Sequence, residues 1–432
     1  MFVLIATIGL ARFGLGSIAP LMATDLKLSS LQVGMLSSAQ NVSYLLFAWV
    51  GGRSVRKFGA GKQIIVSLSL CGVGVIFTGL LSNFILLLLT QAFVGICSGF
   101  ATMAGYGLVF ANFGQRDMGR AVGAVNTAPG IGLLLTGFVG PVFSGYAPNL
   151  GWRLAWYTFG GVTIAIALAS AILLMRDKSG LSDGIAPIVT DVIVPRSKDI
   201  IMRNKKLIFV GLLYFIFGTD YIIYVIFFPS YVTFQLGLGT AIAGNAIIIA
   251  GICASTSGVF LGTLSDRIGR MKTMSIAYFF LAMSSLVALS VTSLNGVYAS
   301  AILFGFFSMG LPAVIIVMAQ SLSSATVAAE AVGFVTIFHG TGQAVGPTVA
   351  GYLSTAQKYY SPDFVMMLIL SFAGAALALI AVFCSCRLGS NFSPNILATS
   401  LNSLSIFVIL QMNFEKRRDS VSCKEMSSSS HE

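Results

Sequence analysis

Long apolar runs, broken at regular intervals by short polar or charged stretches, cover most of the chain. Each run has about the 20 residues that an α-helix needs to cross the hydrocarbon core of a bilayer. Six runs precede a polar stretch from Arg176 to Lys206, and six follow it. The pattern predicts an all-α membrane protein with twelve transmembrane helices, at about residues 2–22, 31–51, 63–82, 84–113, 119–146, 152–175, 207–229, 238–262, 273–292, 296–322, 330–353 and 363–386.

The composition supports a membrane protein and excludes an ordinary soluble enzyme. Of 432 residues, 56% are hydrophobic and only 9% are charged, whereas soluble domains are about 25% charged. The net charge of +11 does not indicate a nucleic-acid partner, because most of the basic residues lie in a few short loops. The partner that this composition predicts is the lipid bilayer.

Basic residues alternate from side to side between the predicted spans. The loops at 52–62, 114–120, 176–206 and 265–272 together hold sixteen Lys or Arg, and the opposite loops have almost none. Because Lys and Arg accumulate on the cytoplasmic side, we expect a cell (inner) membrane protein with both termini in the cytoplasm.

The two ends of the chain carry further expectations. Met1 stands directly at the first span, and Arg12 interrupts any signal-peptide core, so we expect a retained helix and a true start upstream of Met1. The apolar stretch at 397–412 is short, is rich in Ser and Asn and precedes a basic cluster. We therefore expect a cytoplasmic tail, disordered or interfacial, and not a thirteenth span.

An internal repeat relates the two sets of six spans. A shift of 210 residues aligns Gly52 and Gly59 with Gly262 and Gly269, and residues 121–123 with 331–333, which are Ala-Val-Gly in both copies. Two parallel repeats are a transporter architecture with a site between the halves near the middle of the membrane. The predicted division is a first half at 1–175, a cytoplasmic linker at 176–206, a second half at 207–387 and the tail at 388–432.

One loop carries a family signature. The segment from Gly262 to Arg270, Gly-Thr-Leu-Ser-Asp-Arg-Ile-Gly-Arg, resembles the cytoplasmic loop between the second and third helices of a half in the major facilitator superfamily. Its signature residues here are Gly262, Asp266, Arg267, Gly269 and Arg270.

The other copy of this loop and the first helix narrow the resemblance. The first-half copy has Arg56 where the signature has Asp. Ala11-Arg12-Phe13-Gly14 followed by Pro20, together with Tyr221-Ile222-Ile223-Tyr224, is similar to the bacterial YbfB-type branch. The resemblance implies the major facilitator fold, in which helices 1, 4, 7 and 10 line the central cavity.

Gly-Pro pairs mark two predicted helices, at 140–141 and 346–347. They resemble a signature that the family associates with exchangers. The alternative is structural, since small residues allow helices to approach closely in lipid and Pro bends them.

Three ionisable residues lie inside predicted spans: Arg12, Asp220 and His339. Burying charge in a membrane is costly, so such residues usually face a cavity or a partner. Arg12 and Asp220 are nearly equivalent in the repeat, and we expect them to face one cavity and neutralise each other, directly or through water. The alternative for Arg12 and Asp220 is a purely structural ion pair. The alternative for His339 is a hydrogen-bonded structural role.

Uncharged polar residues in the spans are the remaining candidates for orienting a ligand. Hydrogen bonding between helices is the alternative role for each of them. They are Asn126, Tyr221, Tyr224 and Gln343, with Gln40, Asn41 and Tyr44 as similar candidates.

The repeat also predicts two cytoplasmic latches of opposite charge. Arg56 is the repeat partner of Asp266, and Arg120 is the partner of Glu330. In the resembling family the loop acid lies against the start of a helix in the opposite half. That arrangement pairs Asp266 with Arg120, and Arg56 with Glu330.

These observations predict a monomeric secondary transporter that works by alternating access. Arg12 favours an anionic or carboxylate-bearing small solute, and Asp220 or His339 would couple transport to protons. The chain has no nucleotide-binding motif, no CxxC and only two His, so we expect no cofactor and no metal. The alternative is a membrane sensor or scaffold that keeps the fold without transporting. A membrane enzyme lacks support, because no set of nucleophile, base and orienting residue is evident.

Overall fold

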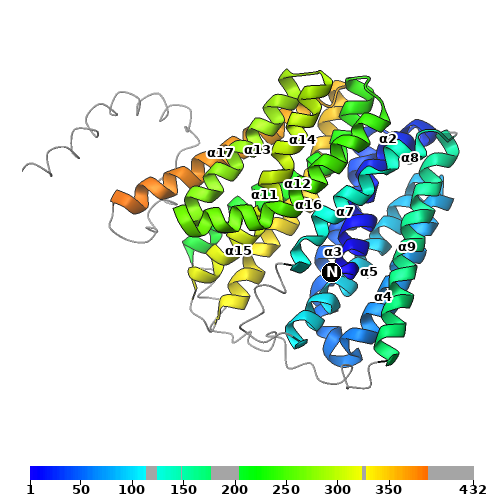
Figure 1. Cartoon of the computed structure of the whole chain (residues 1–432), viewed down its shortest axis with the longest axis horizontal. Helices are drawn as coiled ribbons and strands as arrows, with labels where there is room; N and C mark the ends of the chain where they lie inside the picture. The colour runs from blue at the N-terminus through cyan, green and yellow to red at the C-terminus, as the bar shows by residue number, and fades with distance from the viewer. Residues whose placement is uncertain (113–123, 147, 177–203, 324–326, 388–432) are drawn as a thin grey trace, which may run out of the picture. The chain divides into compact units, whose positions relative to one another are not determined.

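The computed structural model describes residues 1–112, 124–146, 148–176, 204–323 and 327–387 (Figure 1). Met1–Ile380 form one compact unit of packed helices. Of the second unit, Ala381–Glu432, the structure describes only the last turns of one helix. The described residues contain no β-strand, so the predicted all-α class is confirmed.

Helices occupy the described part of every region in which the sequence predicted a span. Nine helical runs in the described part of the chain are long and apolar enough to cross a membrane, judged by length and composition. The helices are α1 (Phe2–Leu4), η1 (Ile5–Phe13), α2 (Gly14–Leu26), α3 (Ser30–Phe58), α4 (Ala60–Leu80), α5 (Phe84–Asn112), α7 (Ala128–Gly137), α8 (Val139–Phe143), α9 (Pro148–Arg176), α11 (Lys205–Ser230), η2 (Tyr231–Gln235), α12 (Thr240–Ile268), α13 (Arg270–Ser290), α14 (Leu294–Ser308), α15 (Leu311–Ser321), α16 (Ala328–Gln357) and α17 (Ser361–Arg387).

Three predicted spans fall outside those nine for identifiable reasons. Helix α3 and helix α16 carry buried amide side chains, Gln40 and Asn41 on one and Gln343 on the other. The pair α7–α8 is shorter, at Ala128–Phe143, and its predicted beginning at 119–123 lies outside the described residues. The polar side chains or the shorter length of these segments therefore lower their apolar character as candidate spans.

Glycine ends the second helix of each predicted half. Gly59 separates α3 from α4 with φ of 79°, and Gly269 separates α12 from α13 with φ of 93°. Positive φ is readily adopted by glycine and costly for other residues. The two turns are equivalent in the predicted repeat and have the same kind of backbone conformation.

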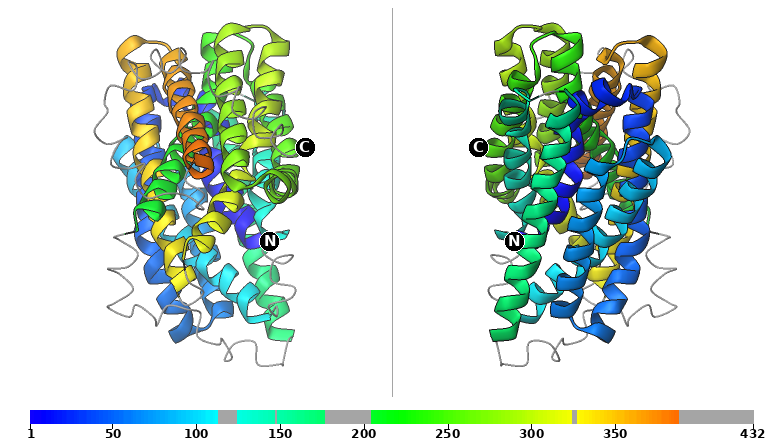
Figure 2. Two further views of the ribbon diagram at one scale, coloured as in Figure 1. Left: turned by 90° about the vertical axis from the view of Figure 1, so that its left-hand side faces the viewer. Right: turned by 90° about the vertical axis from the view of Figure 1, so that its right-hand side faces the viewer.

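Among the described residues, the main contacts between helices of the two predicted halves are α2 on α11, α3 on α16, and α7 with α8 on α12. The contact between α3 and α16 (Figure 2) is closest near the start of α3, where Gly34 lies against the backbone of Pro347. In the same region the Leu31 N–H donates to Thr355 Oγ1 at 2.9 Å, and Thr348 Oγ1 donates to Ser38 Oγ at 2.8 Å. We call this end, which faces outward in the predicted orientation, the outer end, and the end with Gly59 the inner end.

Candidate substrate site between the predicted halves

Arg12 lies buried at the contact between α3 and α16, with 4% of its surface exposed. Its Nη2 donates to Asn41 Oδ1 of α3 and to Gln343 Oε1 of α16, the latter at 2.6 Å. The guanidinium carbon lies 4.5 Å from the ring centroid of Tyr44. Among the described residues, Arg12 Nε has no hydrogen-bond partner. The guanidinium is therefore held by neutral groups from both predicted halves.

The backbone that carries Arg12 is a π-helix, η1, rather than a regular α-helix. A π-helical turn leaves carbonyl groups out of the regular pattern, and such turns are frequent at functional sites. Here Gln40 Nε2 of α3 donates to the Ala11 carbonyl at 2.8 Å. The amide side chain thus fixes α3 to the turn that positions Arg12.

Gln343 links Arg12 to two further side chains. Its Nε2 lies 2.5 Å from the Tyr221 hydroxyl and 2.7 Å from His339 Nε2. The His339 ring stacks on Tyr214 with ring centroids 4.2 Å apart. Arg12, Asn41, Gln343, Tyr221 and His339 form one connected group, which we call the Arg12 cluster.

Asp220 lies apart from this cluster, so the predicted direct neutralisation of Arg12 by Asp220 is wrong in this structure. The Asp220 carboxylate, 1% exposed, accepts a hydrogen bond from Ser371 of α17, and its second oxygen has no partner among the described residues. The physical reason is the helix register. An offset of 209 places Tyr221, not Asp220, opposite Arg12, and neighbouring side chains on an α-helix point about 100° apart.

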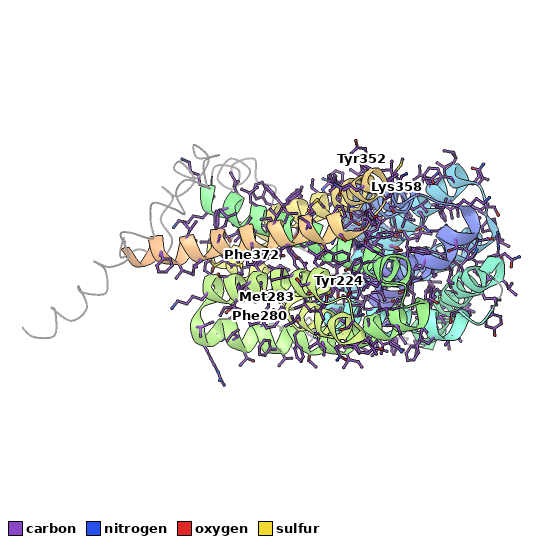
Figure 3. The ribbon with its side chains drawn as sticks, turned by 90° about the horizontal axis from the view of Figure 1, so that it is seen from above. Tyr224, Phe280, Met283, Tyr352, Lys358 and Phe372 are labelled. Atoms are coloured by element: carbon purple, nitrogen blue, oxygen red, sulfur yellow. The ribbon has the colours of Figure 1, made fainter. Side chains whose placement is uncertain are left out.

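Two other predicted residues also lie outside the Arg12 cluster. The Tyr224 hydroxyl (Figure 3) is 3.0 Å from Ser300 Oγ, and its ring stacks on Phe304 with centroids 3.8 Å apart. Asn126 accepts a hydrogen bond of 2.9 Å from the Tyr106 hydroxyl. Both have the hydrogen-bonding roles that were the alternative for them.

The predicted latches remain predictions. Arg120 lies outside the described residues, and the side chain of Arg56 is not among those described. Asp266 lies in the last turn of α12, beside the signature turn at Gly269, and Glu330 lies in the first turn of α16. Neither carboxylate oxygen of Glu330 has a hydrogen-bond partner among the described residues.

The sequence analysis did not identify two residues that contact the candidate site residues. Ser371, the partner of Asp220, was one polar residue in an apolar run, and nothing in the pattern distinguished it. Tyr214 lies two helical turns before Tyr221, so it shares a face of α11 with that residue. This spacing was a signal for the aromatic stack on His339.

The apolar packed helices are those of a multi-pass membrane protein, and comparisons with known proteins identify it as a transporter for small solutes and not an enzyme. Residues 4–383 match the family described as the uncharacterised MFS-type transporter YbfB, and the chain belongs to that family of the major facilitator superfamily. The resemblance seen in the signature loop and around Arg12 is thereby confirmed.

Individual relatives are also transporters. The chain is 26% identical to the 3-(3-hydroxy-phenyl)propionate transporter of Escherichia coli (strain K12), covering 79% of this chain and 81% of that protein. It is 21% identical to the hexuronate transporter of Bacillus subtilis (strain 168), covering 83% and 87%. The crystal structure of the nucleoside transporter NupG shares the fold, with a TM-score of 0.72 at 14% identity, covering 88% of this chain and 98% of that one.

Proposed function

We propose that the protein carries a carboxylate-bearing or otherwise anionic small solute by alternating access, driven by a proton gradient. The observation that carries this proposal is Arg12, a guanidinium buried without an acidic partner in the described structure. A buried cation that only neutral groups solvate is costly. A bound anion would remove that cost, and guanidinium binds carboxylates bidentately.

Alternating access fits the origin of the contacts on Arg12. Asn41 belongs to the first predicted half and Gln343 to the second. If the halves rock about the site, the two amides separate and the set of donors and acceptors around Arg12 changes. The affinity for an anion would then depend on which side of the membrane the site faces.

Asp220 and His339 are the groups proposed to exchange protons. Asp220 has a single hydrogen-bond partner among the described residues and no cation within ion-pair distance there. Ionised, it would carry the full cost of a buried charge, whereas a proton removes that charge. His339 lies in the Arg12 cluster and reaches Arg12 through one side chain, Gln343.

The names of the relatives support an organic anion. Hydroxyphenylpropionate and hexuronate both carry a carboxylate, and the proteins named for them cover about four fifths of this chain. We extend the carboxylate, and not either molecule, to this protein.

The orientation is proposed from the loop charges alone. Both termini, the 53–62 turn and the 176–206 linker would be cytoplasmic, the membrane would be the inner membrane, and the working unit would be a monomer. Cysteine labelling from each side on a cysteine-free background tests the orientation. Labelling of the 416–424 tail from the outside would contradict it.

Uptake into proteoliposomes tests the function. The experiment uses a panel of labelled carboxylates that includes 3-(3-hydroxyphenyl)propionate and D-galacturonate, each with its neutral amide, with and without a pH gradient. Arg12→Gln is compared with Arg153→Gln, whose arginine donates to Gly79 and Ser82 away from the cluster.

Wild type should accumulate a carboxylate and not its amide, and Arg153→Gln should do the same. Arg12→Gln should lose about 10- to 100-fold, the value of hydrogen bonds to a charged group. The proposal fails if no carboxylate moves, or if Arg12→Gln transports as wild type does.

A further inference from the structure

The hydrogen bonds around Gln343 can run in only one direction. Arginine has donors and no acceptor, so the atom of Gln343 at 2.6 Å from Arg12 Nη2 must be its carbonyl oxygen, Oε1. The amide nitrogen, Nε2, therefore faces the Tyr221 hydroxyl and His339 Nε2. Both contacts use an amide N–H as the donor.

This direction fixes the state of His339. Its Nε2 accepts from Gln343 and so carries a lone pair rather than a proton. These contacts require a neutral ring with its one N–H proton on Nδ1, an atom that has no hydrogen-bond partner among the described residues. Gln343 can make its contacts to Arg12 and to His339 together only while His339 stays neutral.

We propose that Gln343 makes a proton on His339 and the Arg12–Gln343 hydrogen bond mutually exclusive, and thereby couples proton uptake to anion binding at Arg12. When His339 Nε2 takes a proton, it becomes a donor that faces the amide donor of Gln343. Rotation of the amide restores that contact, since Oε1 then accepts from His339. The same rotation turns the NH₂ group toward Arg12 Nη2, where two donors cannot bond. This inference rests on the proposed anion site.

Release from Gln343 completes a binding edge on Arg12. Nε already lacks a partner in the described structure, and Nη2 loses one of its two acceptors. These two nitrogens form one edge of the planar guanidinium, which matches a carboxylate bidentately. An anion and a proton therefore favour each other, and the effect is reciprocal. This link acts in addition to the proton proposed for Asp220.

The other groups near His339 do not replace this link. Arg12 on η1 is the charged neighbour, and Tyr214 and Tyr221 on α11 are the titratable residues that pack against the ring. Helix α3 contributes Tyr44, beside Arg12. Helix α15 has no titratable side chain, and Asp220 is bonded to Ser371.

Nitrogen NMR tests the link without a ligand. The chain has two His, so a full-length His431→Gln protein labelled with ¹⁵N-histidine reports His339 alone. We expect the neutral ring to carry its proton on Nδ1, with Nε2 hydrogen-bonded. A neutral ring with the proton on Nε2 would overturn the proposal.

The variant Gln343→Met removes the link, and Gln343→Glu keeps an acceptor for Arg12 but no donor for His339. In Gln343→Met the proton no longer breaks an Arg12 bond, so the His339 titration midpoint should move up by about one pH unit, equivalent to about tenfold. An unchanged His339 midpoint in whichever variant folds, Gln343→Met or Gln343→Glu, would overturn the inference.

Benzoate as the anion separates this inference from the proposed function. In wild type, benzoate should raise the His339 midpoint, and lower pH should tighten benzoate binding by the same factor, about 5- to 100-fold. In Gln343→Met benzoate should still bind, with a smaller linkage than in wild type, because only the direct charge interaction between the anion and His339 remains. Full linkage in Gln343→Met defeats the inference and leaves the anion site intact. Equal benzoate binding by wild type and Arg12→Gln defeats the anion site instead.

Discussion

Arg12 and Asp220, the two buried charged residues of the first helix in each predicted half, have contrasting surroundings. Arg12 contacts α3 of one half and α16 of the other through amide oxygens. Asp220 contacts α17, which belongs to its own half, through a single hydroxyl group. The repeat places the two residues at nearly the same depth, yet only Arg12 lies at the contact between the halves.

The difference separates two tasks that a coupled transporter must perform. A charge held by both halves experiences different partners when the halves move, as a substrate-binding group requires. A carboxyl group held within one half keeps its hydrogen bond during that motion, so its charge can change without a change in packing. We therefore assign the anion to Arg12, and to Asp220 a proton that is taken up away from the anion.

The largest effect is expected at Asp220. A gradient of one pH unit is worth about 1.4 kcal/mol per proton, or about tenfold accumulation, and Asp220→Asn should lose this accumulation. Exchange of solute across the membrane should persist, because a neutral amide mimics the protonated acid. Proteoliposome uptake with and without the gradient measures both.

Asp363 provides the matched control for Asp220. It is equally buried, accepts from Ser354 at 2.5 Å and also leaves one oxygen without a partner in the described structure. Because Asp363 lies in the first turn of α17, at the outer end and not at the depth of Arg12, Asp363→Asn should keep gradient-driven accumulation. Unchanged proton-coupled transport in Asp220→Asn would remove Asp220 as a coupling group.

The next effect concerns the motion that Arg12 is proposed to experience. A Cβ atom at Gly34 would overlap the Pro347 carbonyl across α3 and α16, whereas one at Gly52 on the same helix meets nothing within 4 Å. Overpacking costs about 1–3 kcal/mol, so Gly34→Ala should slow transport about tenfold by disfavouring closure of the outer end.

Gly52→Ala, the control, should transport at the wild-type rate. Thiol labelling of a Ser38→Cys reporter at the outer contact should be faster with Gly34→Ala than without it. Equal labelling rates would show that closure of α3 on α16 is not what limits transport.

The predicted latches should give a smaller effect at the inner end. Exposed ion pairs are worth about 0–1 kcal/mol, so Asp266→Arg should reduce the transport rate by no more than about fivefold. Adding Arg120→Asp should restore the rate by re-forming an opposite-charge pair. If the double variant is no faster than Asp266→Arg, the pairing is wrong.

The smallest expected effect is at Tyr44, whose ring faces the Arg12 guanidinium. A cation–π contact is worth about 0.5–2 kcal/mol, and only the part of it that orients Arg12 affects the anion, so Tyr44→Leu should weaken anion binding about two- to fivefold. Tyr44→Phe keeps the ring and should bind as wild type does. The same loss in both variants would assign the effect to the hydroxyl group.

The sequence predicted the fold well, because hydropathy and the repeat act over whole helices. The predicted runs coincide with helices in the described residues, and the equivalence of Gly59 and Gly269 appears as two positive-φ turns. The sequence did not predict the π-helix at Ile5–Phe13, since its register depends on contacts such as Gln40 with the Ala11 carbonyl.

The sequence predicted the residues of the candidate site but not which of them contact one another. Arg12, His339, Tyr221, Gln343 and Asn41 were all singled out, and they form one cluster. The direct pairing of Asp220 with Arg12 failed because the repeat fixes depth only to within a residue. One residue on a helix changes the direction of a side chain by about 100°.

The most direct test that Arg12 binds the anion is the binding of carboxylates to purified wild-type, Arg12→Gln and Asp220→Asn proteins. Binding is measured as a rise in melting temperature, with the carboxylates of the uptake panel. We expect at least one carboxylate to stabilise wild type and Asp220→Asn alike, and Arg12→Gln to gain no stability from it. If no carboxylate stabilises wild type more than Arg12→Gln, or if Asp220→Asn loses the stabilisation that Arg12→Gln retains, the assignment of the anion to Arg12 is wrong.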